Sequence, residues 1–257
     1  MKLNVAVIAL RLVDFLVNGV IVIVFGLLFI CGLYRFVDSE FAYRQADNAV
    51  SYDRPEKRRK LSFEQVRRMN HDVFGWLEVD GTGISYPLVR GSDNVKYVNT
   101  DVKGRFSLIG SIFLDCRISD ASSIIYGHHM NRHRMFGSLE RFEGRKFFER
   151  HRTGWLFYDK RWHRVHFFAF VKADAHDPVL FNPYLEKGRK AESGYLKYVR
   201  RHACRYRKIR DLREEHFVTL ATCSEKSTNG RYLLIGRIER EGSISSGRRM
   251  EMVDEQD

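Results

Sequence analysis

The chain has 257 residues, of which 44% are hydrophobic and 13% aromatic, and its formal net charge is +12. This length suits one domain of ordinary size with an additional segment, and the apolar and aromatic content excludes a disordered chain. The excess of positive charge predicts an anionic neighbour, such as nucleic acid, anionic lipid or an acidic wall polymer, without choosing among them.

The first predicted element is an apolar helix over residues 15–34, FLVNGVIVIVFGLLFICGLY, which carries no charge. About 20 apolar residues suffice for a helix to cross the hydrocarbon core of a membrane, whereas the core of a signal peptide usually has about 7–15. No A-x-A cleavage site follows, so the sequence predicts an uncleaved anchor rather than a signal peptide or a buried core helix. Basic residues on the two sides of the span are nearly balanced, which leaves the orientation open.

After the anchor, the polar and charged residues 35–61 are predicted to form a juxtamembrane helix and connector. The following LSFEQVRRMNHDVFGWL predicts a short helix that is capped at Ser62. Phe63, Val66 and Met69 would lie on one face of this helix.

From Val73 onward the sequence predicts short strands. Asp80-Gly81-Thr82-Gly83 indicates a hairpin turn between two apolar runs, and Asp159-Lys160 separates another pair. Further strands are predicted in SLIGSIFLD, SSIIYGHH, HFVTLATC and RYLLIGRI, of which the last two form the closing pair. Residues 189–212 predict one long basic helix before that pair. Many short strands with one inserted helix indicate a mostly β barrel or sandwich rather than a doubly wound α/β fold.

The four cysteines are Cys31, Cys116, Cys204 and Cys223, and none of them forms a C-x-x-C pair. A zinc ribbon is therefore not expected. Cys116 and Cys204 could be bridged in an extracellular domain, but two buried free thiols are the default expectation.

Three candidate catalytic residues lie at strand ends. His128 follows an apolar strand and a glycine, Cys223 ends the strand TLATC, and Arg231 begins the next strand. Cysteine is a strong nucleophile, histidine moves protons at neutral pH, and arginine can hold an oxyanion. Together the three side chains suit acyl transfer through a thioester.

The histidine cluster leaves an alternative open. His128 and His129 are adjacent, so on extended backbone they point to opposite sides, and only one can face Cys223. His128, His129 and His133 could instead bind a metal ion, but H-H-x-x-x-H without a helix or a carboxylate is a weak metal signal.

These residues carry a resemblance to a known family. YGHHM, then TLATC, then an arginine eight positions after the cysteine resemble the sortase pattern, in which TLxTC holds the nucleophile. The order of YPLVRGSDNVKYVNTDVKG, GSIFLD and IIYGHHMNRHRMFGSL, with a helix before the cysteine strand, resembles class B sortases from about residue 62 to residue 241. The sequence departs from the pattern at Ala221, where serine is frequent, and at Cys116, where a thiol is not expected.

The resemblance implies a fold, roles and partners. The fold is an eight-stranded β-barrel with N-terminal helices and a long helix before the cysteine strand. Cys223 would be the nucleophile, His128 the acid for the leaving amine, and Arg231 the oxyanion or substrate clamp. Asn94, Val98 and Thr222 would bind the substrate.

The implied reaction cleaves a sorting signal after Thr in a surface protein and passes the thioester to an amine. That amine would belong to a lipid II-type peptidoglycan precursor or to a pilin. The catalytic domain would lie outside the cell on a single-pass membrane anchor, with no metal, no organic cofactor and no nucleic acid. The implied organisation is a cytoplasmic N-terminus, the anchor, the connector, the sortase domain and a flexible tail, at residues 1–14, 15–34, 35–61, 62–241 and 242–257.

Two other functions stay open. The basic segment 200–213 interleaves Arg and Lys with His202 and Tyr206, which would suit a nucleic-acid-binding protein. Another cysteine/histidine wall enzyme, an L,D-transpeptidase or an NlpC-like peptidase, is the second alternative. In NlpC-like enzymes the cysteine precedes the histidine, whereas here His128 comes 95 positions before Cys223.

Overall fold

The computed structural model describes residues 2–49, 63–117, 122–181, 189–208, 216–223 and 229–239. The chain divides into two units, residues 1–45 and 46–257, which are described separately. The predicted helix cap at Ser62, residues 50–61 of the predicted connector and the predicted tail 242–257 lie outside the described residues.

The first unit consists of one long helix, α1 (Lys2–Ala49), which runs past the unit's last residue, Gln45. Within it, Val7–Phe41 has a mean hydropathy of 2.7 and is long and apolar enough to cross a membrane. Its large apolar side chains are exposed around the helix, including Phe15, Phe25 and Phe29 at 68–75%. The helix contains the predicted span 15–34 and continues through residues that were predicted to begin the connector.

The second unit holds the remaining elements. Its helices are α2 (Phe63–Met69), α3 (Arg145–Arg150) and α4 (Arg189–His202), with 3-10 helices η1 (Lys96–Val98) and η2 (Gly137–Glu143). Its strands are β1 (Val73–Val79), β2 (Ser85–Val89), β3 (Ile112–Leu114), β4 (Ser122–Tyr126), β5 (Thr153–Tyr158), β6 (Arg161–Asp174), β7 (Ala203–Tyr206), β8 (His216–Cys223) and β9 (Gly230–Ile238).

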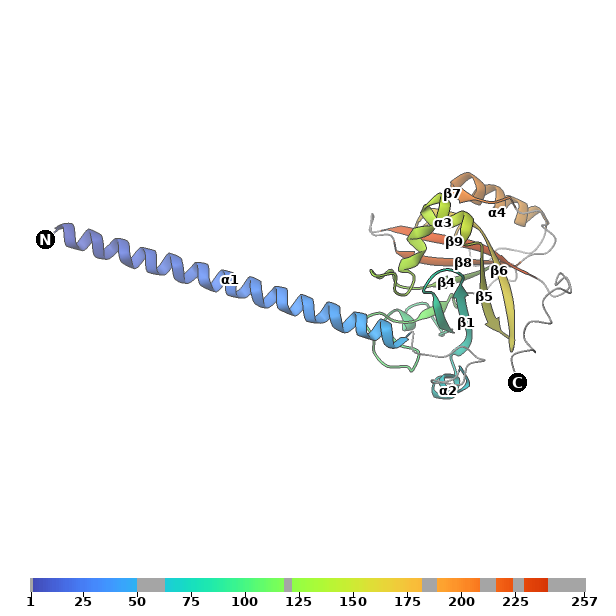
Figure 1. Cartoon of the computed structure of the whole chain (residues 1–257), viewed down its shortest axis with the longest axis horizontal. Coiled ribbons are helices and arrows are strands. Elements are labelled where there is room, and N and C mark those ends of the chain that lie inside the picture. The colour runs from blue at the N-terminus through green and yellow to red at the C-terminus, as the bar shows by residue number, and fades with distance from the viewer. Residues whose placement is uncertain are drawn as a thin grey trace, which may run out of the picture. The chain divides into compact units, whose positions relative to one another are not determined.

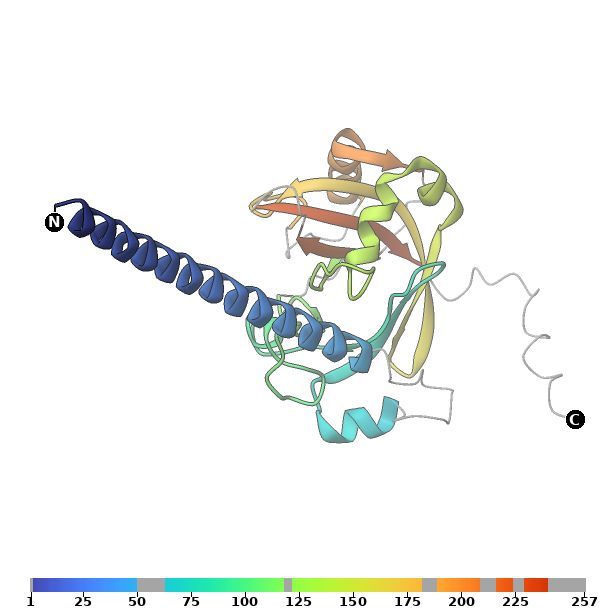
Figure 2. The ribbon, with the colours of Figure 1, turned by 60° about the vertical axis from the view of Figure 1, so that its left-hand side comes forward.

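Eight of these strands close into a barrel (Figures 1 and 2). Among the described residues the order is β5-β1-β2-β3-β4-β8-β9-β6, and a β5–β6 pairing closes the ring. The β2–β3 and β4–β8 pairs are parallel, and the other pairs are antiparallel. The expected eight-stranded barrel is therefore confirmed, and β7 adds a short ninth strand to the outer edge of β6.

Two local turns explain where the barrel's hairpins form. Asp159 and Lys160 join β5 to β6 with φ angles of 50° and 62°. Two successive positive φ angles make the type I′ turn, whose twist matches that of the flanking strands. Gly81 has a φ of 74° in the turn between β1 and β2, where a residue without Cβ is unstrained. Both predicted hairpins are present.

Helix α4 packs against the outer face of the barrel. Its buried side chains Tyr195, Leu196 and Val199 lie in one core cluster with Phe217 of β8 and Phe168 of β6. The rings of Tyr195 and Phe217 are 5.5 Å apart, which fixes the helix over β8.

The prediction of one long basic helix over 189–212 is wrong for residues 203–208, and residues 209–212 lie outside the described residues. The helix ends at His202, and the next four residues form β7, which lies beside α4 (Figure 1). Pairing with β6 overrides the helical tendency of this basic segment. Residues 200–208, the described part of the basic segment, therefore do not form the continuous basic helix on which the nucleic-acid alternative depended.

Helix α2 covers another part of the outer face. Phe63 and Val66 are buried and share a core cluster with Trp76 and Val89. Met69 was expected on the same face but is 55% exposed, because the helix ends there and the chain turns toward β1.

The contact between α4 and β8 gives a test of the fold. Phe217 is fully buried, and large-to-small changes of buried Phe typically cost about 3–5 kcal/mol. We expect Phe217→Ala to lower the free energy of unfolding by that amount in urea denaturation of the detergent-solubilised chain. Phe106→Ala is the matched control, because Phe106 is 73% exposed, and should change stability by less than about 0.5 kcal/mol. Equal effects of the two changes would contradict this packing.

Candidate active site

Cys223 and Arg231 are direct neighbours across two strands. Cys223 is the last residue of β8, and Arg231 is its partner in the antiparallel register with β9. Side chains that are opposite each other in such a pair lie on the same face of the sheet. Cys223 is exposed and Arg231 is half-buried, with its Nη1 donating to the carbonyl of Gly230 at 2.9 Å. The sheet thus presents a thiol and a guanidinium side by side.

His128 comes to the other side of the same strand end. The parallel register of β4 and β8 runs to the pair Tyr126–Ala221, and the amide of Gly127 donates to the carbonyl of Ala221 at 3.1 Å. His128 and Cys223 each lie two residues beyond that pair, at the same level of neighbouring chain segments. Because β8 lies between β4 and β9, Cys223 is flanked by His128 and Arg231.

The two adjacent histidines have different partners. Nε2 of His128 lies 2.9 Å from the carbonyl oxygen of Val98. Nε2 of His129 lies 3.5 Å from Oε2 of Glu140, and its ring lies near that of Tyr232. Among the described residues, no three His, Cys, Asp or Glu side chains gather as metal ligands would. His128, His129 and His133 thus do not form such a group.

The residues predicted to bind substrate are held in different ways. The side-chain Nδ2 of Asn94 donates to Oδ1 of Asp115 at 2.8 Å, and the side-chain Oδ1 of Asn94 accepts from the main-chain amide of Cys116 at 2.8 Å. Val98 is half-buried and contacts His128 through its main chain. Thr222 is only 3% exposed, and its Oγ1 has no hydrogen-bond partner in the described part of the chain. Substrate contacts of these three residues stay predictions.

Asp115, the partner of Asn94, is a carboxylate with only 1% of its side chain exposed. Arg117 donates to both carboxylate oxygens, at 3.0 and 2.8 Å, and the hydroxyl of Tyr126 donates at 3.0 Å. Burial alone would raise the pKa of Asp115, but the hydrogen bonds from Arg117 and Asn94 outweigh it and hold that pKa below its usual value. Burial raises the pKa of Tyr126, so its hydroxyl keeps the proton that it donates.

The other cysteines are unbridged. All four are free, with Cys116 half-buried and Cys204 exposed on β7. The expectation that Cys204 is a buried thiol is therefore wrong, because residue 204 lies on a strand at the sheet's outer edge rather than on a helix.

Sequence reasoning missed the partner of His128. The acceptor is a main-chain carbonyl in η1, and no residue type signals which carbonyl will point at a distant side chain. The sequence predicts that the segment DNVKYV acts through the side chains of Asn94 and Val98. The structure shows that the segment contacts His128 through the main-chain carbonyl of Val98.

Comparisons with known proteins bear on the family and the fold. No family model matches the sequence. The sortase B of Listeria monocytogenes serovar 1/2a is 27% identical over 217 residues, covering 79% of this chain and 83% of that protein.

Two solved structures have a higher sequence identity to this chain, over a smaller share of it. One is a class B sortase from Streptococcus pyogenes involved in pilus biogenesis, at 38% identity and a TM-score of 0.64, covering 69% of this chain and 97% of that one. The other is the sortase B from the type II pilus of Streptococcus pneumoniae, at 31% identity and a TM-score of 0.56, covering 67% of this chain and 95% of that one.

The barrel and the likeness to these proteins define a cysteine transpeptidase with the sortase fold. The identity to the Streptococcus pyogenes enzyme over nearly all of that chain shows that this chain belongs to the class B sortases.

The buried carboxylate gives a pH test. Because the pKa of Asp115 is lower in the folded state, its charge stabilises the fold above its unfolded pKa of about 3.9. That contribution is lost as the pH falls through the lower folded pKa. We expect Asp115→Asn to be less stable than wild type at pH 7 and to lose less stability between about pH 5 and pH 2, measured by chemical denaturation.

Asp159→Asn is the matched control, since Asp159 is exposed in the β5–β6 turn. Its pH dependence should follow that of wild type. Parallel curves for wild type and Asp115→Asn would show that Asp115 does not stabilise the fold as a carboxylate.

Proposed function

We propose that this class B sortase is a membrane-anchored enzyme that cleaves a sorting signal after Thr and transfers the protein to an amine. Cys223 is the nucleophile, His128 exchanges the protons and Arg231 stabilises negative charge. The helix α1 is the single-pass anchor, with the catalytic domain outside the cell. In support of this, Val7–Phe41 has the length and composition of a span.

The observation that carries the proposal is the strand register. Cys223 is exposed at the end of β8, Arg231 is its direct partner on β9, and His128 follows β4 at the same level. These are the nucleophile, the cation and the proton carrier that acyl transfer requires.

The reaction proceeds in two displacements. The thiolate of Cys223 attacks the carbonyl carbon of the Thr residue, and the guanidinium of Arg231 stabilises the oxyanion. When the peptide bond breaks, the imidazolium of His128 gives its proton to the leaving amine, and a thioester remains on Cys223. The acceptor amine then attacks the thioester, His128 takes a proton from it, and the thiolate is released with a new amide bond formed.

The acceptor that we favour is the amine of a lipid II-type peptidoglycan precursor. A pilin amine is the second candidate, because two pilus sortases are 38% and 31% identical to this chain.

The nucleophile can be tested with a panel of quenched pentapeptides and the detergent-solubilised chain. We expect cleavage after Thr by wild type, no cleavage by Cys223→Ala, and a covalent adduct on Cys223 detected by mass spectrometry. Cys204→Ala is the control, because Cys204 is exposed but lies on β7, and it should keep full activity. A peptidoglycan stem peptide and a pilin lysine peptide are then added separately as acceptors. The one that is joined to the cleaved substrate identifies the acceptor class. Cleavage that survives alkylation of Cys223 would reject the covalent mechanism.

The roles of the flanking residues can be tested with the same peptides. Loss of an oxyanion donor typically lowers kcat by about 100- to 1,000-fold, so we expect Arg231→Ala to fall in that range. Arg231→Lys should recover only part of it, because a lysine has no planar fork of donors. His128→Ala should lose at least about 100-fold, since general acid–base catalysis contributes that much. Full activity of either alanine variant would remove that residue from the mechanism.

A further inference from the structure

The loop between β2 and β3 makes direct contact with the proposed proton carrier. Nε2 of His128 lies 2.9 Å from the carbonyl oxygen of Val98, the last residue of η1. A carbonyl oxygen can only accept, so Nε2 must carry a hydrogen. In the neutral ring Nδ1 is then without a hydrogen, and it is the nitrogen that can exchange a proton.

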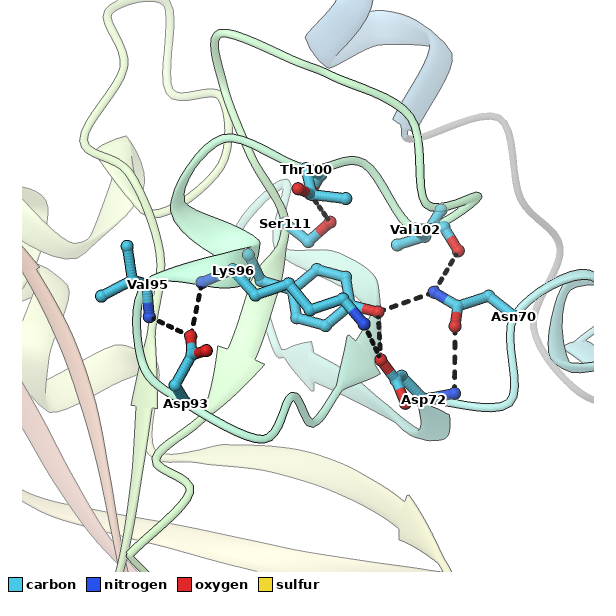
Figure 3. A network of polar contacts seen from close by, with 9 residues as sticks. Asn70, Asp72, Asp93, Val95, Lys96, Thr100, Val102 and Ser111 are labelled. Atoms are coloured by element: carbon cyan, nitrogen blue, oxygen red, sulfur yellow. Dashed lines mark hydrogen bonds and ion pairs between the residues drawn. The ribbon is translucent and has the colours of Figure 1, made fainter.

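The residue before Val98 is anchored by a polar network. Tyr97 is fully buried, its hydroxyl donates to Oδ2 of Asp72 at 2.7 Å, and it accepts from Nδ2 of Asn70 at 2.8 Å. Lys96 also donates to Asp72 at 2.7 Å, and Asn70 donates to the carbonyl of Val102 at 3.0 Å (Figure 3). Asn70 and Asp72, just before β1, thus tie η1 and the following loop to the barrel.

The ionisation states suit this network near neutral pH. The hydrogen bonds from Lys96 and then Tyr97 hold the pKa of Asp72 below its usual value, so its carboxylate is charged and accepts both bonds. Burial raises the pKa of Tyr97, so its hydroxyl keeps the proton that it donates.

Gly110 and Ser111, which precede β3, also contact the main chain of η1. Gly110 has a φ of 56°, and a Cβ at this position would lie 2.3 Å from the carbonyl oxygen of Val98 and 2.4 Å from that of Tyr97. The amide of Ser111 donates to the carbonyl of Tyr97 at 3.0 Å, and its hydroxyl donates to that of Thr100 at 2.7 Å. Hydrogen bonds thus hold the main chain at Tyr97 and Thr100, on either side of Val98, and Gly110 packs closely against the Val98 carbonyl.

We propose that Tyr97, held by Asp72 and Asn70, is a positioning residue that keeps the Val98 carbonyl on Nε2 of His128 and directs Nδ1 toward Cys223. The inference rests on the proposed function, since it takes His128 as the proton carrier. In this role the network fixes the tautomer and the ring orientation of His128.

The main test compares Tyr97→Phe with wild type in the full chain in detergent. Loss of the hydroxyl leaves the ring in place but releases η1 from Asp72 and Asn70. A misplacement of about 1 Å can cost on the order of 100-fold in rate, so we expect kcat to fall about 10- to 100-fold while KM changes less than about twofold. Selective ¹⁵N labelling of histidine should show His128 protonated on Nε2 in wild type and a mixture of tautomers in Tyr97→Phe.

Tyr195→Phe is the matched control, because Tyr195 is also a buried tyrosine but lies on α4. It should match wild type in kcat and in the His128 spectrum. A second pair of variants, at Asp72, keeps the test valid if Tyr97→Phe does not fold. The side chain of Asp72 is 33% exposed, so changing it disturbs the core less than changing the buried Tyr97. Asp72→Ala should reproduce the loss of kcat, and Asp72→Asn, whose amide oxygen can still accept from Tyr97, should restore part of it.

The outcomes separate this inference from the proposed function. If His128→Ala stays active, the proposed role of His128 is wrong whatever Tyr97 does. If His128→Ala is inactive while Tyr97→Phe and Asp72→Ala both match wild type in kcat and tautomer, the positioning role is wrong. A loss of kcat in these variants with an unchanged His128 tautomer would also overturn it, because the effect would then be general destabilisation.

Discussion

The pairing of β8 with β9 is the constraint on which the site depends. Side chains alternate between the two faces of a strand, so a shift of one residue would move every side chain of β8 to the other face. Cys223 would then point where Thr222 points now, among buried residues. The register is secured along the whole strand, because Phe217, Thr219 and Ala221 face the side covered by α4, whereas Val218 and Leu220 face the other buried side. Burial of the six residues 217–222 thus determines where one thiol meets solvent.

The residues on the two sides of Cys223 are held in place by different kinds of contact. Arg231 is placed by strand pairing, since it is the direct partner of Cys223. His128 lies beyond the last residue of β4 and needs further contacts, and it has them in the amide of Phe136, which donates to its carbonyl at 3.0 Å, and in the Val98 carbonyl. The histidine is therefore the member of the three whose placement depends on loops. Loops tolerate sequence change better than paired strands do.

The sequence allowed much of this to be predicted, and the failures have physical reasons. Strands with alternating burial and hairpins with Asp-Gly or Asp-Lys turns are local patterns, so β1–β2, β5–β6 and β8–β9 were expected. The β7 strand was missed because its four residues, Ala-Cys-Arg-Tyr, lie in a basic segment with helical character, and only pairing with β6 makes them a strand. The contact of the Val98 carbonyl with His128 was missed because a main-chain acceptor leaves no mark on the sequence. The Asp72–Tyr97 bond was missed because its partners are 25 residues apart and form no local pattern. Asn94 was assigned to substrate on resemblance, whereas both ends of its side-chain amide contact Asp115 and Cys116.

The exposed thiol of Cys204 has a practical consequence for chemical labelling. Cys204 lies on β7 at the edge of the sheet, and Cys223 lies at the end of β8, so an electrophile meets two accessible sulfur atoms in the described barrel unit. Bulk incorporation of a thiol reagent will therefore overstate occupancy at the nucleophile. Titration of functional enzyme, or screening for covalent inhibitors, requires a background in which residue 204 carries no sulfur.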